Sequence, residues 1–366
     1  MMPYPPPAPL RRRSLQTLAT LPAAWLLASL SACGGGGGGG GGGEDQPAAA
    51  AVSDRQVTVA PGVALHVRDW NPSRPGRTVV LLAGLGGNAQ GFNGLAAALA
   101  RRARVLAISR RGYGRSDKPL PAAGGGYDPA TLVADLDAVL RTLRVDEIVL
   151  CGHSIAGNEL TLFAGRYPHR VRGLVYLDTS YDYTRPVPWH GEPPPDNPAL
   201  EEPEPGPADQ ASLAAATAFA RRVSKLWSAA AEAQLRDSLT LLPDGSVRPN
   251  TPAPVAAAMA DQGHAFSPDY RAVASPALIV AAEPGAIPDM FPWLSATTDA
   301  ATLADAQTML GIFRQARRID AGRLAAALPG SRVLWLPHAS HANFFDEYQG
   351  EVVRAIESMP WYEADR

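Results

Sequence analysis

The sequence predicts an α/β protein in which a mostly parallel sheet is covered by helices on both faces. Short apolar segments recur along the chain and alternate with helical patterns, an order typical of parallel sheets. The segments are apolar throughout rather than at every second residue, as expected of strands that are buried on both faces. We expect these strands at residues 78–82, 105–108, 147–151, 173–177, 277–281 and 333–336.

Composition favours one large globular domain. The chain has 366 residues, of which 46% are hydrophobic, and its formal net charge is −2. The two signs of charge are interspersed without a basic stripe, so we expect no nucleic-acid partner. Cys33 and Cys151 are the two cysteines of the chain, and Cys151 is expected to be a buried apolar residue. No histidine and cysteine cluster has the spacing of a metal site, so no metal is expected.

The first 32 residues predict a signal peptide. Three arginines at 11–13 precede an uncharged segment, 14–30, that is rich in leucine and alanine but too short and polar for a membrane span. The residues Leu30 to Cys33 resemble a bacterial lipobox, which implies that the exported protein is anchored to a membrane of the cell envelope through a lipid on Cys33. Gly34 favours the outer membrane, with the domain in the periplasm or at the cell surface. The alternative is an ordinary secretory signal that is cut elsewhere.

A flexible linker is expected from residue 33 to 54. Ten consecutive glycines, 34–43, are followed by polar residues and alanines that cannot bury apolar surface. From Arg55 the apolar residues alternate on both sides of Pro61 and Gly62, which predicts a β-hairpin. The folded domain is therefore expected to extend from 55 to 366.

Residues 182–270 interrupt the alternation of strands and helices. A proline-rich segment, 186–207, precedes an alanine-rich helical stretch from about 208 to 241. Outside the insertion, a helix is also expected from Pro129 to about 143. We interpret the insertion as a cap over the mouth of the site, because ligands bind outside the carboxyl ends of parallel strands. The alternative is a surface elaboration without substrate contact. Several aromatic residues are candidates for pocket lining or packing, namely Tyr181, Tyr183, Trp189, Trp227 and Trp293.

The segment from Gly152 to Gly157 predicts a nucleophile elbow. It reads Gly-His-Ser-Ile-Ala-Gly and lies between the apolar strand 147–151 and a helical pattern, which is the context that such an elbow requires. Ser154 is the candidate nucleophile, and Ala156 replaces the usual second glycine. The glycine-rich turn 83–88 follows the strand 78–82, and we expect the backbone amides of Leu85 and Ile155 to form an oxyanion hole.

These motifs resemble the α/β-hydrolase superfamily from roughly residue 55 to the C-terminus. The segment 109–119, Ser-Arg-Arg-Gly-Tyr-Gly-Arg-Ser-Asp-Lys-Pro, resembles the loop after the fourth strand in capped members such as esterases, epoxide hydrolases and haloalkane dehalogenases. Ser109 replaces the usual aspartate and Ala83 the usual histidine. The resemblance implies the α/β-hydrolase fold with a helical cap. The serine at the elbow, instead of a carboxylate, implies an acyl-enzyme formed from an ester, amide or thioester.

The resemblance also indicates the general base and leaves its acidic partner open. The family's histidine follows the last strand, which selects His341 over His338. At the commonest position of the acid, after the strand 277–281, this chain has a glycine, with Glu283 and Asp289 nearby. Asp178, which ends the strand 173–177, is the favoured candidate, and Glu283 and Asp289 remain alternatives. His153 is expected to be a packing or pocket-wall residue.

The leading hypothesis is a serine hydrolase that acts on a small-molecule acyl substrate without a cofactor or metal. A ligand-binding or sensor protein that retains the fold but turns over little or nothing is the second hypothesis. Cofactor-free perhydrolase or haloperoxidase chemistry is the third, because similar triads support it. The sequence gives no indication of the oligomeric state.

Overall fold

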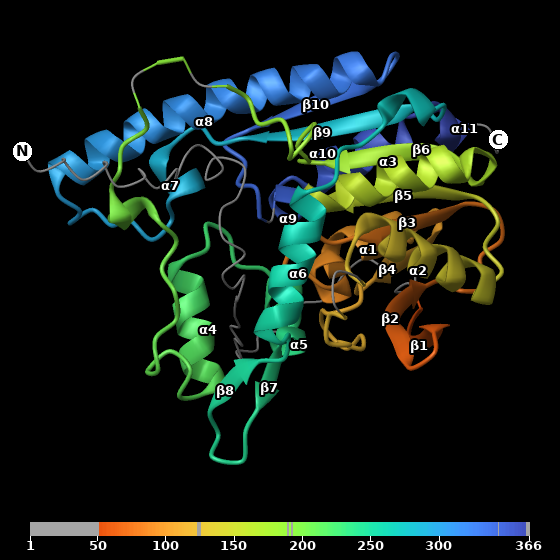
Figure 1. Ribbon diagram of the computed structural model, residues 1–366, viewed down its shortest axis with the longest axis horizontal. Helices are drawn as coiled ribbons and strands as arrows, with labels where there is room; N and C mark the ends of the chain where they lie inside the picture. Colours follow the sequence, from red (N-terminus) through yellow and green to blue (C-terminus); the bar gives the residue numbers. More distant parts are fainter. Residues whose placement is uncertain (1–50, 123–125, 189, 192, 343, 364–366) are drawn as a thin grey trace, which may run out of the picture.

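The computed structural model describes residues 51–122, 126–188, 190–191, 193–342 and 344–363. The expected signal peptide, Cys33 and almost all of the expected linker lie outside these residues. Within them, an eight-stranded sheet has the order β1-β2-β4-β3-β5-β6-β9-β10 (Figure 1). The pairs from β4 to β10 are parallel, whereas β2 is antiparallel to both β1 and β4. This is the α/β-hydrolase fold, which confirms the predicted fold class.

The strands of the main sheet are β1 (Val52–Ala60), β2 (Val63–Trp70), β3 (Thr78–Leu82), β4 (Arg104–Ile108), β5 (Ile148–His153), β6 (Val171–Leu177), β9 (Ala277–Glu283) and β10 (Arg332–Pro337). A separate hairpin consists of β7 (Leu239–Leu241) and β8 (Val247–Pro249). The helices are α1 (Asn93–Leu99), α2 (Pro129–Thr142), α3 (Gly157–Arg166), α4 (Leu213–Arg222), α5 (Ala229–Ser238), α6 (Ala253–His264), α7 (Ile287–Met290), α8 (Ala300–Ala327), α9 (Phe344–Glu347), α10 (Gln349–Glu357) and α11 (Pro360–Glu363).

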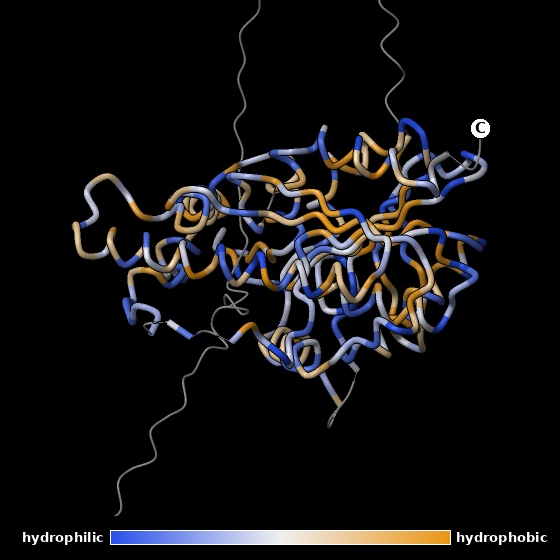
Figure 2. Tube along the Cα trace, turned by 90° about the horizontal axis from the view of Figure 1, so that it is seen from above, coloured by the Kyte–Doolittle hydropathy of each residue, from blue (hydrophilic) through white to orange (hydrophobic). Residues whose placement is uncertain are grey.

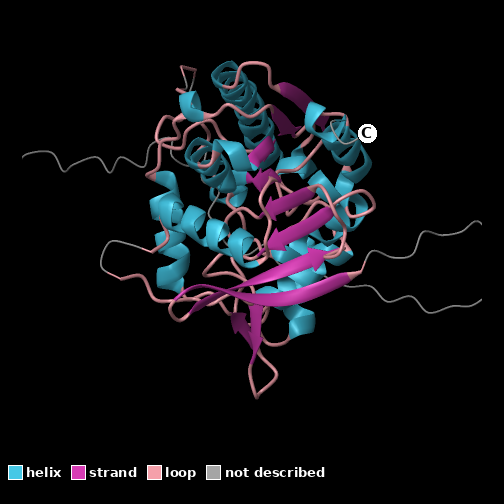
Figure 3. Ribbon diagram, turned by 90° about the vertical axis from the view of Figure 1, so that its right-hand side faces the viewer, coloured by secondary structure: helices cyan, strands magenta, loops and turns pink. Residues whose placement is uncertain are grey.

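Two apolar layers lie on opposite faces of the sheet. Along β3, Val79 and Leu81 belong to one layer, and Val80 and Leu82 to the other, because successive side chains of a strand point to opposite faces. The first layer includes α1, α9 and α10, and the second includes α2, α3 and the end of α8. Figure 3 shows the strands between these helices, and Figure 2 shows that the most hydrophobic trace follows the centre of the sheet.

The six strands predicted from apolar segments are all present, with ends that differ by at most two residues. Two other expectations need correction. The first strand begins at Val52, inside the segment expected to be linker. The helical stretch expected from about 208 to 241 is two helices, α4 and α5, followed by β7, because Ser228 begins a new helix by accepting a hydrogen bond from Ala231 N.

The segment between β6 and β9 contains α4, α5, the β7–β8 hairpin and α6, which gather on one side of the molecule (Figure 1). The long helix α8 lies beside β9 (Figure 1). Sequence analysis did not predict α8, whose 28 residues show little separation of polar and apolar faces. Among the described residues, no helix combines the length and apolar composition that would let it cross a membrane.

Candidate active site

Ser154 occupies a strained turn directly after β5. Its φ is +55°, a left-handed conformation that non-glycine residues seldom adopt outside functional turns. The turn needs small neighbours, since a Cβ at Gly152 would lie 2.3 Å from Leu160 Cδ1 and one at Gly157 would lie 2.9 Å from the Thr179 side chain. The sharp connection from β5 to α3 therefore presents the serine hydroxyl at the carboxyl end of the sheet.

The alanine at position 156 fits this turn. Its side chain is fully buried, and its Cβ lies 3.1 Å from the place that a Cβ of residue 152 would take. Gly152 therefore supplies the space that the methyl group of Ala156 occupies. The departure from the usual second glycine leaves the elbow intact.

His341 lies between Ser154 and Asp178. Its Nε2 is 3.0 Å from Ser154 Oγ, and its Nδ1 is 2.5 Å from Asp178 Oδ2. Asp178 follows β6, Ser154 follows β5, and His341 lies in the loop between β10 and α9. Three segments that are far apart in the sequence thus bring a hydroxyl, an imidazole and a carboxylate into one line of hydrogen bonds.

The carboxylate of Asp178 is almost fully buried and remains ionised. Burial alone would raise its pKa, but the charge of Arg317 and the hydrogen bond with His341 outweigh burial, so the pKa lies well below its usual value. Oδ1 accepts hydrogen bonds from the backbone N of Ala282, at 2.8 Å, and from Arg317 Nε, at 3.0 Å. Oδ2 is thereby left to His341.

Glu283 and Asp289, the two alternative acids, have other partners. Glu283 pairs with Arg314 and Arg318, whose nitrogens lie 3.0 and 2.7 Å from its Oε1. Asp289 lies 3.0 Å from Lys225 Nζ and accepts hydrogen bonds from the backbone of residues 285 and 286. These ion pairs stabilise the surroundings of α7 and α8, whereas the imidazole of His341 contacts Asp178.

The other histidine of the C-terminal loop points away from the serine. The side chain of His338 is 64% exposed, and its Nδ1 lies 3.3 Å from Asp289 Oδ2. Its backbone has a φ of +57°. The structure therefore places His341, and not His338, within hydrogen-bond distance of Ser154.

His153 is buried beside the elbow. Its Nε2 donates a hydrogen bond to the carbonyl oxygen of His341, 2.8 Å away. The rings of Phe344 and Phe345 approach it edge-on. Burial lowers the pKa of His153 to about 3, with a smaller effect from the neighbouring His341. The ring is therefore neutral at physiological pH.

The glycine-rich turn after β3 lies against the elbow. A Cβ at Gly84 would be 2.9 Å from Ser154 Cβ, so only glycine permits this approach. Gly86 has a φ of +72°, which also favours glycine. Arg110 holds the turn by donating to the carbonyl oxygen of Gly84 at 2.7 Å, and its charge is balanced by buried Glu159 at 2.5 Å. Leu85 and Ile155, the expected amide donors, thus belong to two backbone segments that meet at the serine.

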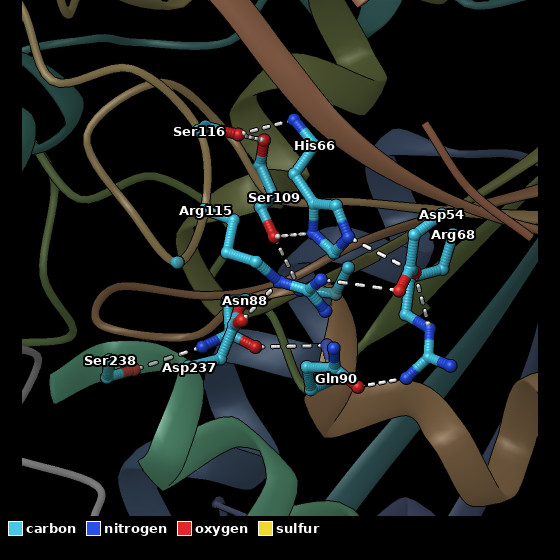
Figure 4. A network of polar contacts seen from close by, with 12 residues as sticks. Asp54, His66, Arg68, Asn88, Gln90, Ser109, Arg115, Ser116, Asp237 and Ser238 are labelled. Carbon is cyan, nitrogen blue, oxygen red and sulfur yellow. Dashed lines mark hydrogen bonds and ion pairs between the residues drawn. The ribbon is translucent and has the colours of Figure 1, made fainter. Parts of the chain in front are cut away.

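A polar network joins the core to helix α5 (Figure 4). Asn88, at the end of the glycine-rich turn, donates 3.0 Å hydrogen bonds to the carbonyl oxygen of Gln234 and to Ser238 Oγ. Arg115 Nε donates to Asp237 Oδ1 at 2.7 Å. Helix α5 is therefore attached to the loop that approaches the serine.

Ser109 belongs to the same network and replaces the aspartate that the resemblance leads one to expect. Its hydroxyl lies 3.4 Å from His66 Nδ1 and accepts a hydrogen bond from the backbone N of Ala89 at 3.0 Å (Figure 4). His66 Nε2 lies 3.2 Å from Asp54 Oδ1. Ser109 and His66 are at most 1% exposed, so this serine and histidine pair is a structural link without access for a ligand.

Two residues near the triad, Arg317 and Tyr183, were not identified as site residues from the sequence. Arg317 was not predicted, because the sequence around it carries no motif. Tyr183 was only one of several aromatic candidates. Its side chain makes a hydrogen bond with Ser154, which opposes the rise in the pKa of Tyr183 that burial causes. Among the described residues, no group of three His, Cys, Asp or Glu side chains is arranged to hold a metal ion.

Comparison with known proteins agrees with this architecture. Residues 77–233 match a family model described as the alpha/beta hydrolase fold. The chain superposes on the crystal structure of E-2-(acetamidomethylene)succinate hydrolase with a TM-score of 0.56 and 24% identity, which covers 84% of this chain and 98% of that one. The chain therefore has the α/β-hydrolase fold that the sequence predicts.

Two curated relatives are similar over about a third of the chain. One is 2-(acetamidomethylene)succinate hydrolase of Mesorhizobium japonicum, 30% identical over 32% of this chain and 39% of the relative. Another is a non-heme chloroperoxidase of Streptomyces lividans, 35% identical over 33% of this chain and 43% of the relative. The chain thus matches less than half the length of each of these relatives.

Proposed function

We propose that the protein is a serine hydrolase that cleaves an ester or a related acyl bond through Ser154, His341 and Asp178. The observation that carries this proposal is the strained serine at the elbow, whose hydroxyl lies 3.0 Å from an imidazole that contacts a buried carboxylate. A hydroxyl, a base and an orienting acid in this order activate a serine for attack on a carbonyl carbon.

In the proposed reaction, Ser154 Oγ attacks the acyl carbon while its proton passes to His341 Nε2. Asp178 accepts the hydrogen bond from Nδ1 and stabilises the imidazolium, which then protonates the leaving group. Water then attacks the acyl carbon while His341 takes its proton. The bond between the acyl carbon and Ser154 Oγ breaks, His341 returns the proton to this oxygen, and the acid is released. The backbone amides of Leu85 and Ile155 would stabilise the oxyanion, each contributing about 3 kcal/mol to the transition state.

The close approach of Gly84 to Ser154 supports this assignment of the oxyanion hole, because it brings the two backbone segments together. The two curated relatives, which match about a third of this chain, do not define the substrate. The hydrolase from Mesorhizobium japonicum supports the reaction class, since its name describes the hydrolysis of a small acylated molecule. We therefore propose a small-molecule acyl substrate.

A second candidate activity is peracid formation. The similarity to a non-heme chloroperoxidase favours it. In this reaction hydrogen peroxide takes the place of water, attacks the acyl carbon of the acyl-enzyme, and leaves as a peracid while Ser154 regains its proton. The same triad would serve both reactions, so the nucleophile that resolves the acyl-enzyme distinguishes them.

A fluorophosphonate probe together with a panel of short p-nitrophenyl esters tests the proposal. We expect covalent labelling and ester turnover in the native protein and neither in Ser154→Ala. Ser109→Ala is a matched control, because this serine is buried in the network of Figure 4, and it should label normally. Equal labelling of the native protein and Ser154→Ala would overturn the assignment. A protein that binds ligands but shows no serine-dependent burst would instead be the sensor considered above.

We also propose, from the sequence, that the protein is exported and anchored through a lipid on Cys33. Metabolic labelling with an alkyne fatty acid in a bacterial host should label the native protein and Cys151→Ala, but not Cys33→Ala. The Cys33→Ala variant should also be absent from the membrane fraction and be recovered in the soluble fraction. A label that persists in Cys33→Ala would contradict lipidation at this residue.

A further inference from the structure

Arg317 makes two contacts with the carboxylate that holds His341. Its Nε donates to Asp178 Oδ1 at 3.0 Å, and its Nη2 also contacts this oxygen. The side chain of Asp178 is 1% exposed and that of Arg317 is 9% exposed. Buried charges of this kind persist when they are paired, so the two residues form a tight internal ion pair next to the imidazole.

The arginine comes from α8, which lies outside the cap and beside β9. Its other acidic neighbour is Asp320, one turn further along the helix. Asp320 accepts a hydrogen bond from the backbone N of Tyr181 at 2.9 Å and lies 3.7 Å from Arg323. Asp320 thus has partners of its own, and the guanidinium of Arg317 is directed at Asp178.

We propose that Arg317 is a positioning residue that acts through Asp178, both by fixing the carboxylate toward His341 and by offsetting its negative charge. This inference rests on the proposed triad. A carboxylate beside an imidazole favours the imidazolium, and a cation on the far side of that carboxylate opposes this effect. Arg317 would therefore keep His341 neutral, and able to accept a proton, at lower pH than a lone aspartate would allow.

The groups around His341 support this reading. Asp178 contacts Nδ1 of His341, and Ser154 contacts Nε2. His153 donates a hydrogen bond to the backbone carbonyl of His341, and the centres of the two rings are 4.7 Å apart. Tyr183 makes a hydrogen bond with Ser154. Of these residues Asp178 carries a charge at physiological pH, because burial keeps His153 neutral and the phenol of Tyr183 is protonated there.

The charged groups further along the C-terminal loop pair with one another. Lys225 lies 3.0 Å from Asp289 and 2.7 Å from Glu347, and Asp289 also lies 3.3 Å from His338. These pairs are the same in all the variants below. Arg317 is therefore the cation whose removal leaves Asp178 unbalanced.

The sign of the expected change follows from the charges. Without Arg317, the carboxylate of Asp178 stabilises the imidazolium of His341 more strongly. The base must be neutral to act, and the acid limb of kcat/KM therefore moves to higher pH. An arginine with a merely structural role would lower activity at every pH and leave the limb in place.

Profiles of kcat/KM from pH 5 to 9 with p-nitrophenyl acetate, recorded for Arg317→Gln, Arg317→Lys and Arg318→Gln, test the inference. We expect the acid limb of Arg317→Gln to move up by at least half a pH unit. In Arg317→Lys the acid limb should stay at its native pH, because the positive charge remains. Its kcat should be lower, because an ammonium group cannot make both contacts that the guanidinium makes with Asp178. Arg318→Gln is the neighbouring control, 61% exposed, and should resemble the native protein. An unmoved limb in Arg317→Gln would overturn the proposal.

Arg317→Gln leaves a buried carboxylate without its cation, so the folded fraction is first checked by thermal unfolding. If this variant does not fold, Asp178→Asn is compared with Asp178→Asn/Arg317→Gln, in which no buried charge is left unpaired. We expect kcat/KM to differ less than threefold between these two variants, because Arg317 acts through Asp178. A further tenfold loss in the double variant would contradict this mode of action.

A readout without turnover separates this inference from the proposed function. The titration of the His341 ring is followed by nuclear magnetic resonance, with the signal assigned from its absence in His341→Gln. We expect the change of this signal to occur at higher pH in Arg317→Gln than in the native protein. A native protein without serine-dependent hydrolysis would end the proposed function, while an unchanged His341 titration in folded Arg317→Gln would end this inference.

Discussion

The side chain of His153 donates a hydrogen bond to the backbone carbonyl of His341, across 2.8 Å. The residue before the elbow serine therefore holds the loop that carries the opposite imidazole. β5 and the loop after β10 are far apart in the sequence, and this contact joins them at the site. Nε2 carries the donated proton in this contact, and burial is what keeps the ring at position 153 neutral.

The first prediction concerns the dependence of stability on pH. The pKa of His153 is about 3 in the folded protein and about 6.5 when unfolded, so the unfolded chain binds the proton more readily. The stability that depends on a neutral His153 is present above pH 6.5 and is lost as pH falls toward 3. Between pH 6.5 and 5 we expect a loss on the order of 2 kcal/mol, measured by urea unfolding.

His153→Phe removes this titration, so its free energy of unfolding should fall less between pH 6.5 and 5 than that of the native protein. His169→Phe serves as the control, because His169 is exposed in the short helix before β6. The same pH dependence in His153→Phe as in the native protein would contradict the neutral, buried state of this ring.

The second prediction concerns the acid. Asp178→Asn should lower kcat by about three to four orders of magnitude, because an amide no longer favours the tautomer in which His341 accepts the serine proton. Glu283→Gln should change kcat by less than about threefold, since Glu283 pairs with Arg314 and Arg318. Steady-state kinetics with a p-nitrophenyl ester measure both. A larger loss in Glu283→Gln than in Asp178→Asn would transfer the role to Glu283.

The third prediction distinguishes the two histidines of the C-terminal loop. His341→Ala should lower kcat by at least about a thousandfold with little change in the melting temperature, because it removes the proton acceptor of Ser154. His338→Ala is the control, as this side chain is 64% exposed. Its kcat should stay within a few-fold of the native value. Comparable losses in both variants would mean that the loop, rather than one imidazole, supports activity.

The fourth prediction concerns packing at the elbow. Gly152→Ala should destabilise the protein by about 1 to 3 kcal/mol, because the added Cβ would lie 2.3 Å from Leu160 Cδ1. Gly311→Ala is the opposite case, since a Cβ there meets nothing within 4 Å and the residue lies inside α8. It should stabilise by about 0.5 to 1 kcal/mol. Thermal unfolding measures both, and equal melting temperatures for the two variants would refute this account.

The strands and the elbow could be predicted because their determinants are local. A buried parallel strand needs a short apolar run, and the turn at Ser154 needs small residues beside it, here Gly152 and Gly157. The helical stretch in the cap was predicted less well. Alanine-rich sequence favours helix throughout, and only the capping contact of Ser228 marks where a second helix starts.

The sequence by itself determined the fold class, the position of the serine at the elbow and the two histidines that are candidates for the proposed base. Tertiary structure decided the partners. Asp178 and His341 are separated by 163 positions, and they meet because β6 lies between β5 and β9 in the sheet. Arg317 reaches the same carboxylate from a helix that has no motif of its own. Hydrogen bonds and ion pairs depend on distances of about 3 Å, and chain topology sets such distances between remote segments, whereas local sequence pattern does not.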